Sequence, residues 1–496
     1  MRKFNLFVLI FLISLGLAQG ASTGGRIIEK DSSAKGNLIV DPSKGSHVEK
    51  LGLITHDPSK AYQGYTLFAP KHYLTTYLMD MNGGIINTWW SKYEPGQSVY
   101  LLENGNLMHL CHTTPHGDFI GGGEGGRVEE YNWEGDMVWS MWFSDETKLM
   151  HHDYEPLPNG NFLAMVVEKK THQQCIDAGM PAQLFQNARS RFMYPEYIVE
   201  IERFGSQGFE VKWEWHIWDH LVQDFDSTKD NYGVVAEHPE LLSVYQEGTR
   251  FRVGFWNHGN SIDYNAKFDQ ICLDARGQNE FWILDHSTTT EEAKGHTGGR
   301  YGKGGDILYR WGNPMMYDAG TAEDQMLWLQ HDPQWVQDHL PGAGNMIIFN
   351  NGRGRGFSSV DEIVIPQRKD GSFPELKPGE PHKPKELYWT FVTDPPKKMY
   401  STEISGAQRM PNGNTLVCAG TYGRFMEVTP YKEIVWEYKC PVDGNGPMEQ
   451  GMPIVQDSRG HEMNAVFKIN RFSPDYAAFK GRDMTPKLKT LVGVKY

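Results

Sequence analysis

The chain has 496 residues, of which 39% are apolar and 22% are charged, proportions that are typical of a globular protein and exclude wholesale disorder. Its 53 Gly and 27 Pro follow no Gly-X-Y period, which excludes collagen and favours a fold rich in turns. The formal net charge is −14, so the chain lacks the basic footprint of a general nucleic-acid binder.

The N-terminus has the pattern of a secretory signal peptide. Arg2 and Lys3 precede an apolar run at residues 4–17, and small residues follow at a position suited to cleavage. The run is short for a membrane span, although a membrane anchor is the alternative. We therefore expect a periplasmic or secreted protein with no stable membrane span after cleavage. The expected division is a signal peptide at 1–20, an N-terminal extension at 21–60 and a folded domain at 61–496.

Two short patterns recur along the chain. In the first, a turn and a few apolar residues end in a tryptophan. Its six copies end at Trp89, Trp139, Trp213, Trp311, Trp389 and Trp436. In the second, Asn-Gly-Asn precedes an apolar segment, with its last residue at Asn106, Asn161 and Asn414. Asn-Gly supplies the positive φ angles of tight hairpins.

A turn followed by three strands, repeated six times, predicts an all-β fold, a six-bladed β-propeller. The alternative is a β-sandwich with coincidental tryptophans. Residues 171–195 and 217–250 are expected to be helical or irregular insertions. Residues 64–90 supply only part of a blade, and we expect a C-terminal strand at 464–471 to complete it and close the ring.

Five cysteines are scattered along the chain without a Cys-x-x-Cys pair: Cys111, Cys175, Cys272, Cys418 and Cys440. An oxidising compartment permits one or two disulfides. Cys418 and Cys440 flank one predicted hairpin, and we expect them to pair.

Histidines occupy matched positions in the predicted repeats. Aligning the Asn-Gly-Asn turns gives His152 and Ser405 equivalent positions in their repeats, and the equivalent position in the first complete repeat falls near Gln97. His258 and His331 begin two other inner strands. Since inner strands line the channel of a propeller, these three imidazoles are expected to converge at one mouth. The alternative is that each histidine is structural.

Further polar groups accompany these histidines. His151 and Asp153 flank His152, although alternation along a strand sends neighbours to opposite faces. Asp153 with three imidazoles would be a plausible metal site, so bound metal stays open. Arg353 and Arg355 follow the His331 strand in a Gly-rich turn, where a guanidinium suits a tetrahedral oxyanion.

Several motifs resemble the bacterial arylsulfate sulfotransferase family. They are the Asn-His-Gly-Asn-Ser string that begins at Asn257, the Gln330-His-Asp string, the Asn-Asn-Gly-Arg-Gly-Arg string that ends at Arg355, and the string from Ser405 to Asn414. The resemblance runs from about Gly64 to the C-terminus. It implies a periplasmic six-bladed propeller that moves a sulfuryl group from a phenolic sulfate ester to another phenol. It also implies transfer through a sulfated histidine, without a nucleotide donor or other cofactor.

The resemblance implies catalytic roles for His258, His331 and Arg353. The expected substrate-binding residues are His152, Asn260, Arg355 and Ser405. The family's nucleophilic histidine falls near Ser405 in this chain, yet no histidine occurs between His382 and His461. The alignment is offset, or another histidine such as His331 accepts the sulfuryl group, or the chemistry differs.

The expected partners are a small aryl sulfate donor and a phenolic acceptor, with an oligomer possible. Alternatives are a propeller enzyme with altered chemistry, such as a sulfate-ester hydrolase or a histidine-bound metal enzyme, and a non-catalytic binding propeller.

Overall fold

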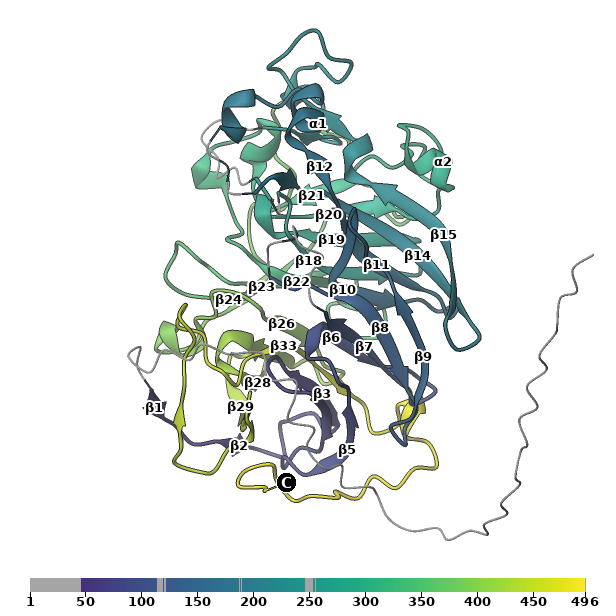
Figure 1. The fold of residues 1–496 in the computed structure, drawn as a ribbon. Coiled ribbons are helices and arrows are strands. Elements are labelled where there is room, and N and C mark those ends of the chain that lie inside the picture. Colours follow the sequence, from purple (N-terminus) through teal and green to yellow (C-terminus); the bar gives the residue numbers. More distant parts are fainter. Residues whose placement is uncertain are drawn as a thin grey trace, which may run out of the picture. The chain divides into compact units, whose positions relative to one another are not determined.

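A computed structural model describes residues 46–113, 119, 122–186, 188, 190–245, 253–254 and 256–495, and its strands belong to one compact unit at residues 40–495. The predicted signal peptide at 1–20 lies outside the described residues. The fold is all-β and propeller-like, with few helices (Figure 1). Within the described ranges, no helix is long and apolar enough to cross a membrane.

Most strands belong to antiparallel groups of four. The first group is β33 (Val466–Phe472), β3 (Tyr65–Pro70), β4 (Thr75–Met79) and β5 (Ile85–Trp90). The second is β6 (Pro95–Leu101), β7 (Leu107–His112), β8 (Gly126–Tyr131) and β9 (Met137–Trp142). The third is β10 (Lys148–Pro156), β11 (Phe162–Glu168), β14 (Glu196–Phe204) and β15 (Gly208–His216).

The second and third groups form one eight-stranded sheet, because β6 and β10 join through the parallel pair Gln97 and His152. The fourth group is β18 (Gly259–Asn265), β19 (Gln270–Ala275), β20 (Glu280–Asp285) and β21 (Tyr309–Trp311). The fifth is β22 (His331–Trp335), β23 (Met346–Asn350), β24 (Ser359–Ile363) and β25 (Trp389–Phe391). The sixth is β26 (Gly406–Arg409), β27 (Thr415–Ala419), β28 (Arg424–Val428) and β29 (Ile434–Lys439), extended by β2 (Gly52–His56).

Short elements connect these strands. The α-helices are α1 (His172–Asp177) and α2 (Thr290–Ala293), and the short strands are β1 (His47–Val48), β12 (Lys170–Thr171), β13 (Phe192–Met193), β16 (Leu221–Val222), β17 (Leu242–Ser243), β30 (Val442–Asp443), β31 (Gly446–Pro447) and β32 (Pro453–Ile454). The 3-10 turns are η1 (Ala182–Phe185), η2 (Ile217–Asp219), η3 (Val235–Glu237), η4 (Arg276–Gln278), η5 (Pro314–Tyr317), η6 (Ala322–Asp324), η7 (Pro396–Met399), η8 (Gly420–Tyr422) and η9 (Ala477–Phe479). In the described parts of the expected insertions near 171–195 and 217–250, the elements are short helices, turns and two-residue strands.

The first strands of the groups contact one another in the cyclic order β33, β6, β10, β18, β22, β26 and back to β33. In Figure 1 these strands gather toward the middle of the view, while the last strands, such as β9 and β15, lie outward. The expected pairing of the C-terminal strand with the opening strands is confirmed, since Thr66 of β3 pairs with Arg471 of β33.

The tryptophan of each repeat makes the same kind of contact. Each indole N–H donates to an acceptor in the next group, at 2.8–3.1 Å. The pairs are Trp89 to Asn132 O, Trp139 to Gly208 O, Trp213 to Thr288 Oγ1, Trp311 to Pro384 O, Trp389 to Pro430 O and Trp436 to Met81 O. The last pair returns to the first group, so the sequence repeat encodes a cyclic series of links.

The Asn-Gly-Asn repeat makes a second kind of link. The last Asn of the turn donates to a Glu on the third strand of its own group, as Asn414 Nδ2 does to Glu427 Oε1 at 2.6 Å. That Glu also binds a basic side chain of the next group. The pairs are Glu130 with Arg203, Glu200 with His286 and Glu427 with Arg471. In the fifth group, Glu362 accepts from Asn345 of a Gly-Ala-Gly-Asn turn and binds Arg409 in the same way. Buried carboxylates are thereby paired and hydrogen-bonded, as low-dielectric surroundings require.

The expected Cys418–Cys440 disulfide is wrong, because all five cysteines are buried thiols. Cys418 lies on β27, and Cys440 follows β29, with β28 between the two strands. Strands two positions apart are separated by about 9–10 Å, beyond the Cα separation that a disulfide spans.

Candidate functional site

A β-bulge marks the same position in the first strands of the middle groups. The register shifts in β6, β10, β18 and β22 near Gln97, His152, the start of β18 and His331. Gln97, His152 and His258 have positive φ angles of 117°, 52° and 45°. Such angles are uncommon for residues other than Gly, and a bulge re-aims side chains out of the regular alternation. The β-bulge near the start of the first strands thus changes the direction of the side chains at equivalent positions of the repeats.

The bulges bring the three predicted histidines together. The ring centroids of His152 and His258 lie 5.2 Å apart. The ring of Phe467, on β33, lies 6.2 Å from His152 and 6.2 Å from His331. Two imidazoles, those of His152 and His331, therefore lie beside one aromatic side chain supplied by the C-terminal strand, and the imidazole of His258 lies beside His152.

His152 is connected to a buried carboxylate through its neighbour. Nδ1 of His152 lies 2.8 Å from Nδ1 of His151, and Nε2 of His151 lies 3.1 Å from Glu196 Oε2. The other oxygen of Glu196 accepts the Gly259 N–H at 2.5 Å. Burial, together with the neighbouring imidazoles of His151 and His258, lowers the pKa of His152 well below its usual value. Its ring is therefore neutral at neutral pH.

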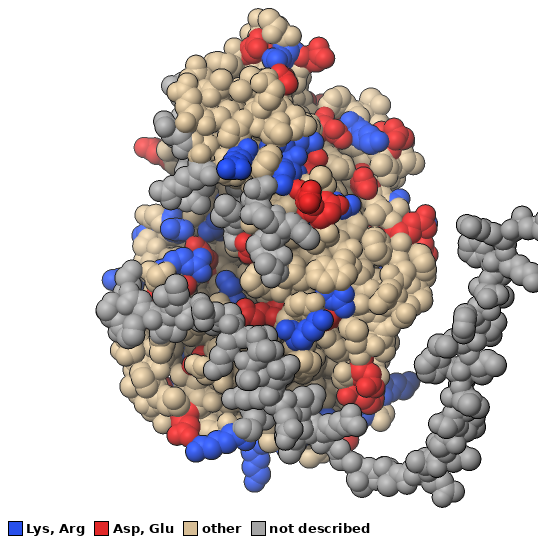
Figure 2. All heavy atoms as spheres, viewed as in Figure 1, with Lys and Arg blue, Asp and Glu red and all other residues tan. Residues whose placement is uncertain are grey.

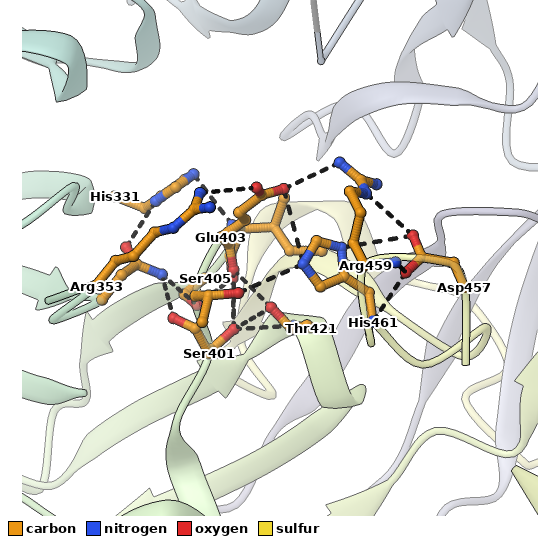
Figure 3. A network of polar contacts seen from close by, with 12 residues as sticks. His331, Arg353, Ser401, Glu403, Ser405, Thr421, Asp457, Arg459 and His461 are labelled. Atoms are coloured by element: carbon orange, nitrogen blue, oxygen red, sulfur yellow. Dashed lines mark hydrogen bonds and ion pairs between the residues drawn. The ribbon is translucent and has the colours of Figure 1, made fainter. Parts of the chain in front are cut away.

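His331 is held at both of its ring nitrogens. Nδ1 lies 2.7 Å from Asn351 Oδ1, and Nε2 accepts the Ile404 N–H at 3.1 Å (Figure 3). This pair of contacts requires the tautomer with its proton on Nδ1. Burial lowers the pKa of His331 to about 3, with the charge of Arg276 acting in the same direction. His331 is a fixed, neutral group.

Ser405 lies next to this contact but is itself engaged. Its hydroxyl donates to the carbonyl oxygen of Ile404, and Asn351 Nδ2 lies 3.4 Å from its oxygen. Asn351 thus links His331 to the Ser405 slot. No base among the described residues hydrogen-bonds the Ser405 hydroxyl.

Arg353 belongs to a network of charged side chains centred on Glu403. Its Nη1 lies 3.4 Å from Glu403 Oε1, and Glu403 is next in sequence to Ile404. Glu403 also faces Arg459 at 3.2 Å and His461 at 3.9 Å (Figure 3). On the face in Figure 2, basic and acidic side chains are interspersed. With the two signs mixed on that face, binding of an anionic ligand would depend on local groups rather than on the overall field.

Two predicted substrate-binding residues have other contacts. The Arg355 guanidinium lies 4.6 Å from the ring centroids of both Trp328 and Phe357 and donates to Ser359 Oγ at 3.0 Å. Asn260 is buried, and its Nδ2 donates to the carbonyl of Gln330 at 3.0 Å. Arg355 therefore packs among aromatic rings, while Asn260 positions the residue before His331.

Asp153 does not join the imidazoles. Its carboxylate binds Lys468 Nζ at 2.8 Å and the Tyr100 hydroxyl at 2.9 Å, and Lys468 also faces Asp332 at 3.5 Å. Burial raises the pKa of Asp332, and burial and the Asp332 charge raise that of nearby Asp263 to about 7. The alternative metal set of Asp153 with three imidazoles is not among the ligand groups that the described residues assemble, and the Asp153 carboxylate is occupied by Lys468 and Tyr100 instead.

Side chains with metal-ligating atoms gather at two other places among the described residues. The groups are His109, Cys111 and Glu129, and His220, His296 and Asp306. In the second, Asp306 Oδ1 lies 2.9 Å from His220 Nδ1 and 2.7 Å from His296 Nδ1.

The repeat alignment missed Glu196, Asn351 and Phe467. Phe467 carries the same signal as the histidines, because it begins the inner strand of the first group, where a slot residue is due. Asn351 stands in the Asn-Gly-Arg string. Glu196 had no signal in its own segment, since its partner His151 lies 45 residues away.

Comparison with known families identifies this chain. The model of the arylsulfotransferase (ASST) family matches residues 40–442. The chain therefore belongs to the arylsulfotransferase family, as the motifs indicated. The match begins before Gly64 and ends before the strand that carries Phe467.

Other comparisons are more distant. No curated protein matches the chain. Among solved structures, a protein of unknown function from Bacteroides caccae is 10% identical, with coverage of 83% of this chain and 99% of that one and a TM-score of 0.39. Virginiamycin B lyase from Staphylococcus aureus is 9% identical, with coverage of 79% and 88% and a TM-score of 0.34.

Proposed function

We propose that this protein is an exported sulfotransferase that moves a sulfuryl group from a phenolic sulfate ester to a phenol, without a nucleotide donor and through a sulfated histidine. Membership of the arylsulfotransferase family supports a sulfotransferase-type function. The observation that carries the finer proposal is that His258 lies beside His152, and that His152 and His331 both lie beside Phe467.

The same proposal includes a six-bladed propeller with a closed ring. It is supported by the cyclic contacts of the first strands and by the return of the indole links from Trp436 to Met81. Closure leaves no unpaired sheet edge at the junction of the chain ends. It also explains why the C-terminal strand delivers Phe467 to a site built by residues hundreds of positions earlier.

Sulfuryl transfer makes two demands on the site. Charge must be stabilised on three equatorial oxygens, and a nucleophile must receive the group. Arg353 and neutral imidazoles are suited to the first demand. A neutral imidazole with an available lone pair is suited to the second, because it is nucleophilic without prior deprotonation.

The test is incubation of the full chain with 4-nitrophenyl sulfate, with and without phenol. Nitrophenol release that rises with phenol, and formation of phenyl sulfate without added nucleotide, is the expected result. Release without phenyl sulfate would establish a sulfate-ester hydrolase instead. Neither release nor a covalent adduct would favour a binding propeller.

A further inference from the structure

The contact between His151 and His152 determines where the protons of both rings lie. Glu196 already accepts the Gly259 N–H, and its other oxygen faces His151 Nε2 at 3.1 Å, which places a proton on that nitrogen. In the tautomer of His151 that holds its single proton on Nε2, Nδ1 carries a lone pair. It accepts the Nδ1 proton of His152 across 2.8 Å.

This arrangement leaves the lone pair of His152 on Nε2. Among the described residues, that atom has no hydrogen-bond partner. The Gly123 backbone, with φ of 82°, lies close to the ring, and a Cβ there would come within 2.3 Å of Nε2. The Glu196–His151 pair thus orients one tautomer in the way that a carboxylate and an imidazole orient a catalytic base.

Two other candidate acceptors, His331 and Ser405, are engaged in hydrogen bonds. The Nε2 lone pair of His331 accepts the Ile404 N–H, and its Nδ1 proton is used by Asn351. The Ser405 hydroxyl donates to the Ile404 carbonyl. His331 could use its Nε2 lone pair, and Ser405 its hydroxyl proton, only after breaking these hydrogen bonds.

We infer that His152 Nε2 is the atom that accepts the sulfuryl group, with His151 and Glu196 as positioning residues. This assignment rests on the proposed sulfotransferase function. The family resemblance gives the nucleophilic position to the Ser405 slot in the sixth group of strands, whereas we assign that role to His152 in the third group.

The two half-reactions balance through this relay. Nε2 forms the N–S bond as the S–O bond to the aryl group breaks, and the phenolate leaves with that electron pair and takes a proton from solvent. The Nδ1 proton of His152 moves to Nδ1 of His151, and the resulting imidazolium faces the Glu196 carboxylate. In the second step, the acceptor phenol oxygen attacks sulfur and its proton passes to solvent. The N–S electron pair returns to Nε2, and His151 returns its proton.

Peptide mapping of the unaltered protein locates the acceptor. After brief incubation with 4-nitrophenyl sulfate at neutral pH, trypsin places the four candidates on separate peptides. These are 149–169 for His152, 253–267 for His258, 311–353 for His331 and 399–409 for Ser405. One sulfuryl mass on 149–169, localised by fragmentation to His152, is expected. An adduct on another peptide would overturn the assignment while leaving the proposed function intact.

Two carboxylates on β14 provide a matched pair of variants. Glu196→Gln turns an amide toward His151 and favours the opposite tautomers, with the Nε2 of His152 protonated. Glu200→Gln removes a carboxylate of the same strand that binds Asn161 at 2.6 Å and His286 at 3.2 Å, outside the relay. We expect Glu196→Gln to lower the single-turnover rate constant at least about tenfold without changing the half-saturating donor concentration. Glu200→Gln should leave that constant within about twofold.

Equal rate constants in the two variants would overturn the positioning role. His152→Asn should abolish the adduct, and far-UV circular dichroism with thermal unfolding checks that it folds. If that variant fails to fold, the mapping of the unaltered chain still decides. Absence of phenol release and of any adduct in the unaltered chain would refute the proposed function rather than the choice of His152.

Discussion

The indole N–H of Trp436 donates to the backbone carbonyl of Met81 at 2.8 Å, across 355 residues of sequence. It is the one indole link of the six that joins the end of the repeats to their beginning. Trp436 is fully buried, and the Arg471 guanidinium lies 4.4 Å from the centre of its ring. The contact between the sixth and first groups of strands therefore combines the indole hydrogen bond, the packing of Arg471 on the indole ring and the buried ion pair of Arg471 with Glu427.

Trp436→Phe should lower the free energy of unfolding by about 1–3 kcal/mol, because the Met81 carbonyl loses its donor in a buried setting. Trp142→Phe is the control, since Trp142 is 49% exposed and should cost less than about 0.5 kcal/mol. Urea denaturation followed by fluorescence measures both. Equal losses would show that the indole link contributes nothing to stability.

Arg471→Met should be more damaging. The guanidinium is fully buried between Glu427 and Thr66, and its removal leaves the Glu427 carboxylate without its cation. We expect a loss of about 3–5 kcal/mol. Adding Glu427→Gln should recover part of that loss, because no unpaired charge then remains. A double variant as unstable as the sum of both single changes would contradict this account.

Stability should depend on the charge of His286. Burial opposes its protonation, but hydrogen bonds to Asp269 and Glu200 outweigh burial and raise its pKa to about 9. A pKa above the unfolded value of 6.5 contributes stability that is complete below pH 6.5 and is lost as pH rises through about 9. His286→Asn should therefore reduce the loss of stability between pH 6.5 and 9.5, by about 2 kcal/mol. A loss of stability between pH 6.5 and 9.5 that is the same with and without His286 would contradict this account.

Substitutions of Arg353 and Arg355 should have different effects, the first on activity and the second on the stability of the fold. Arg353 is 44% exposed on its side chain and pairs with Glu403, so Arg353→Ala should cost little stability. If Arg353 stabilises charge on the transferred group and forms no bond to it, as the proposed function requires, Arg353→Ala should slow both half-reactions by about 10²-fold. Arg355→Ala should mainly destabilise the fold through lost contacts with Trp328 and Phe357. Single-turnover kinetics and thermal unfolding of both variants test this, and the reverse pattern would reassign the roles.

Much of the architecture followed from local patterns. The six tryptophans and the Asn-Gly-Asn turns predicted repeated groups of strands because each repeat needs the same turn and the same interface with its neighbour. The matched histidines followed from the same alignment, since equivalent positions on equivalent strands lie in equivalent places. The Cys418–Cys440 pairing failed because proximity along a hairpin does not specify which strand lies between two residues.

The amino-acid sequence by itself determined the repeat, the all-β class, the family and the set of histidines, because periodic spacing and local motifs are properties of neighbouring residues. Only the tertiary structure decided which imidazole nitrogen has a lone pair that is not already used in a hydrogen bond. That depends on Glu196 facing His151, on Ile404 donating to His331 and on the left-handed backbone of His152. Each is a contact or a dihedral angle that arises when strands distant in sequence pack together, and hydrogen-bond partners, rather than residue type, fix the proton on an imidazole.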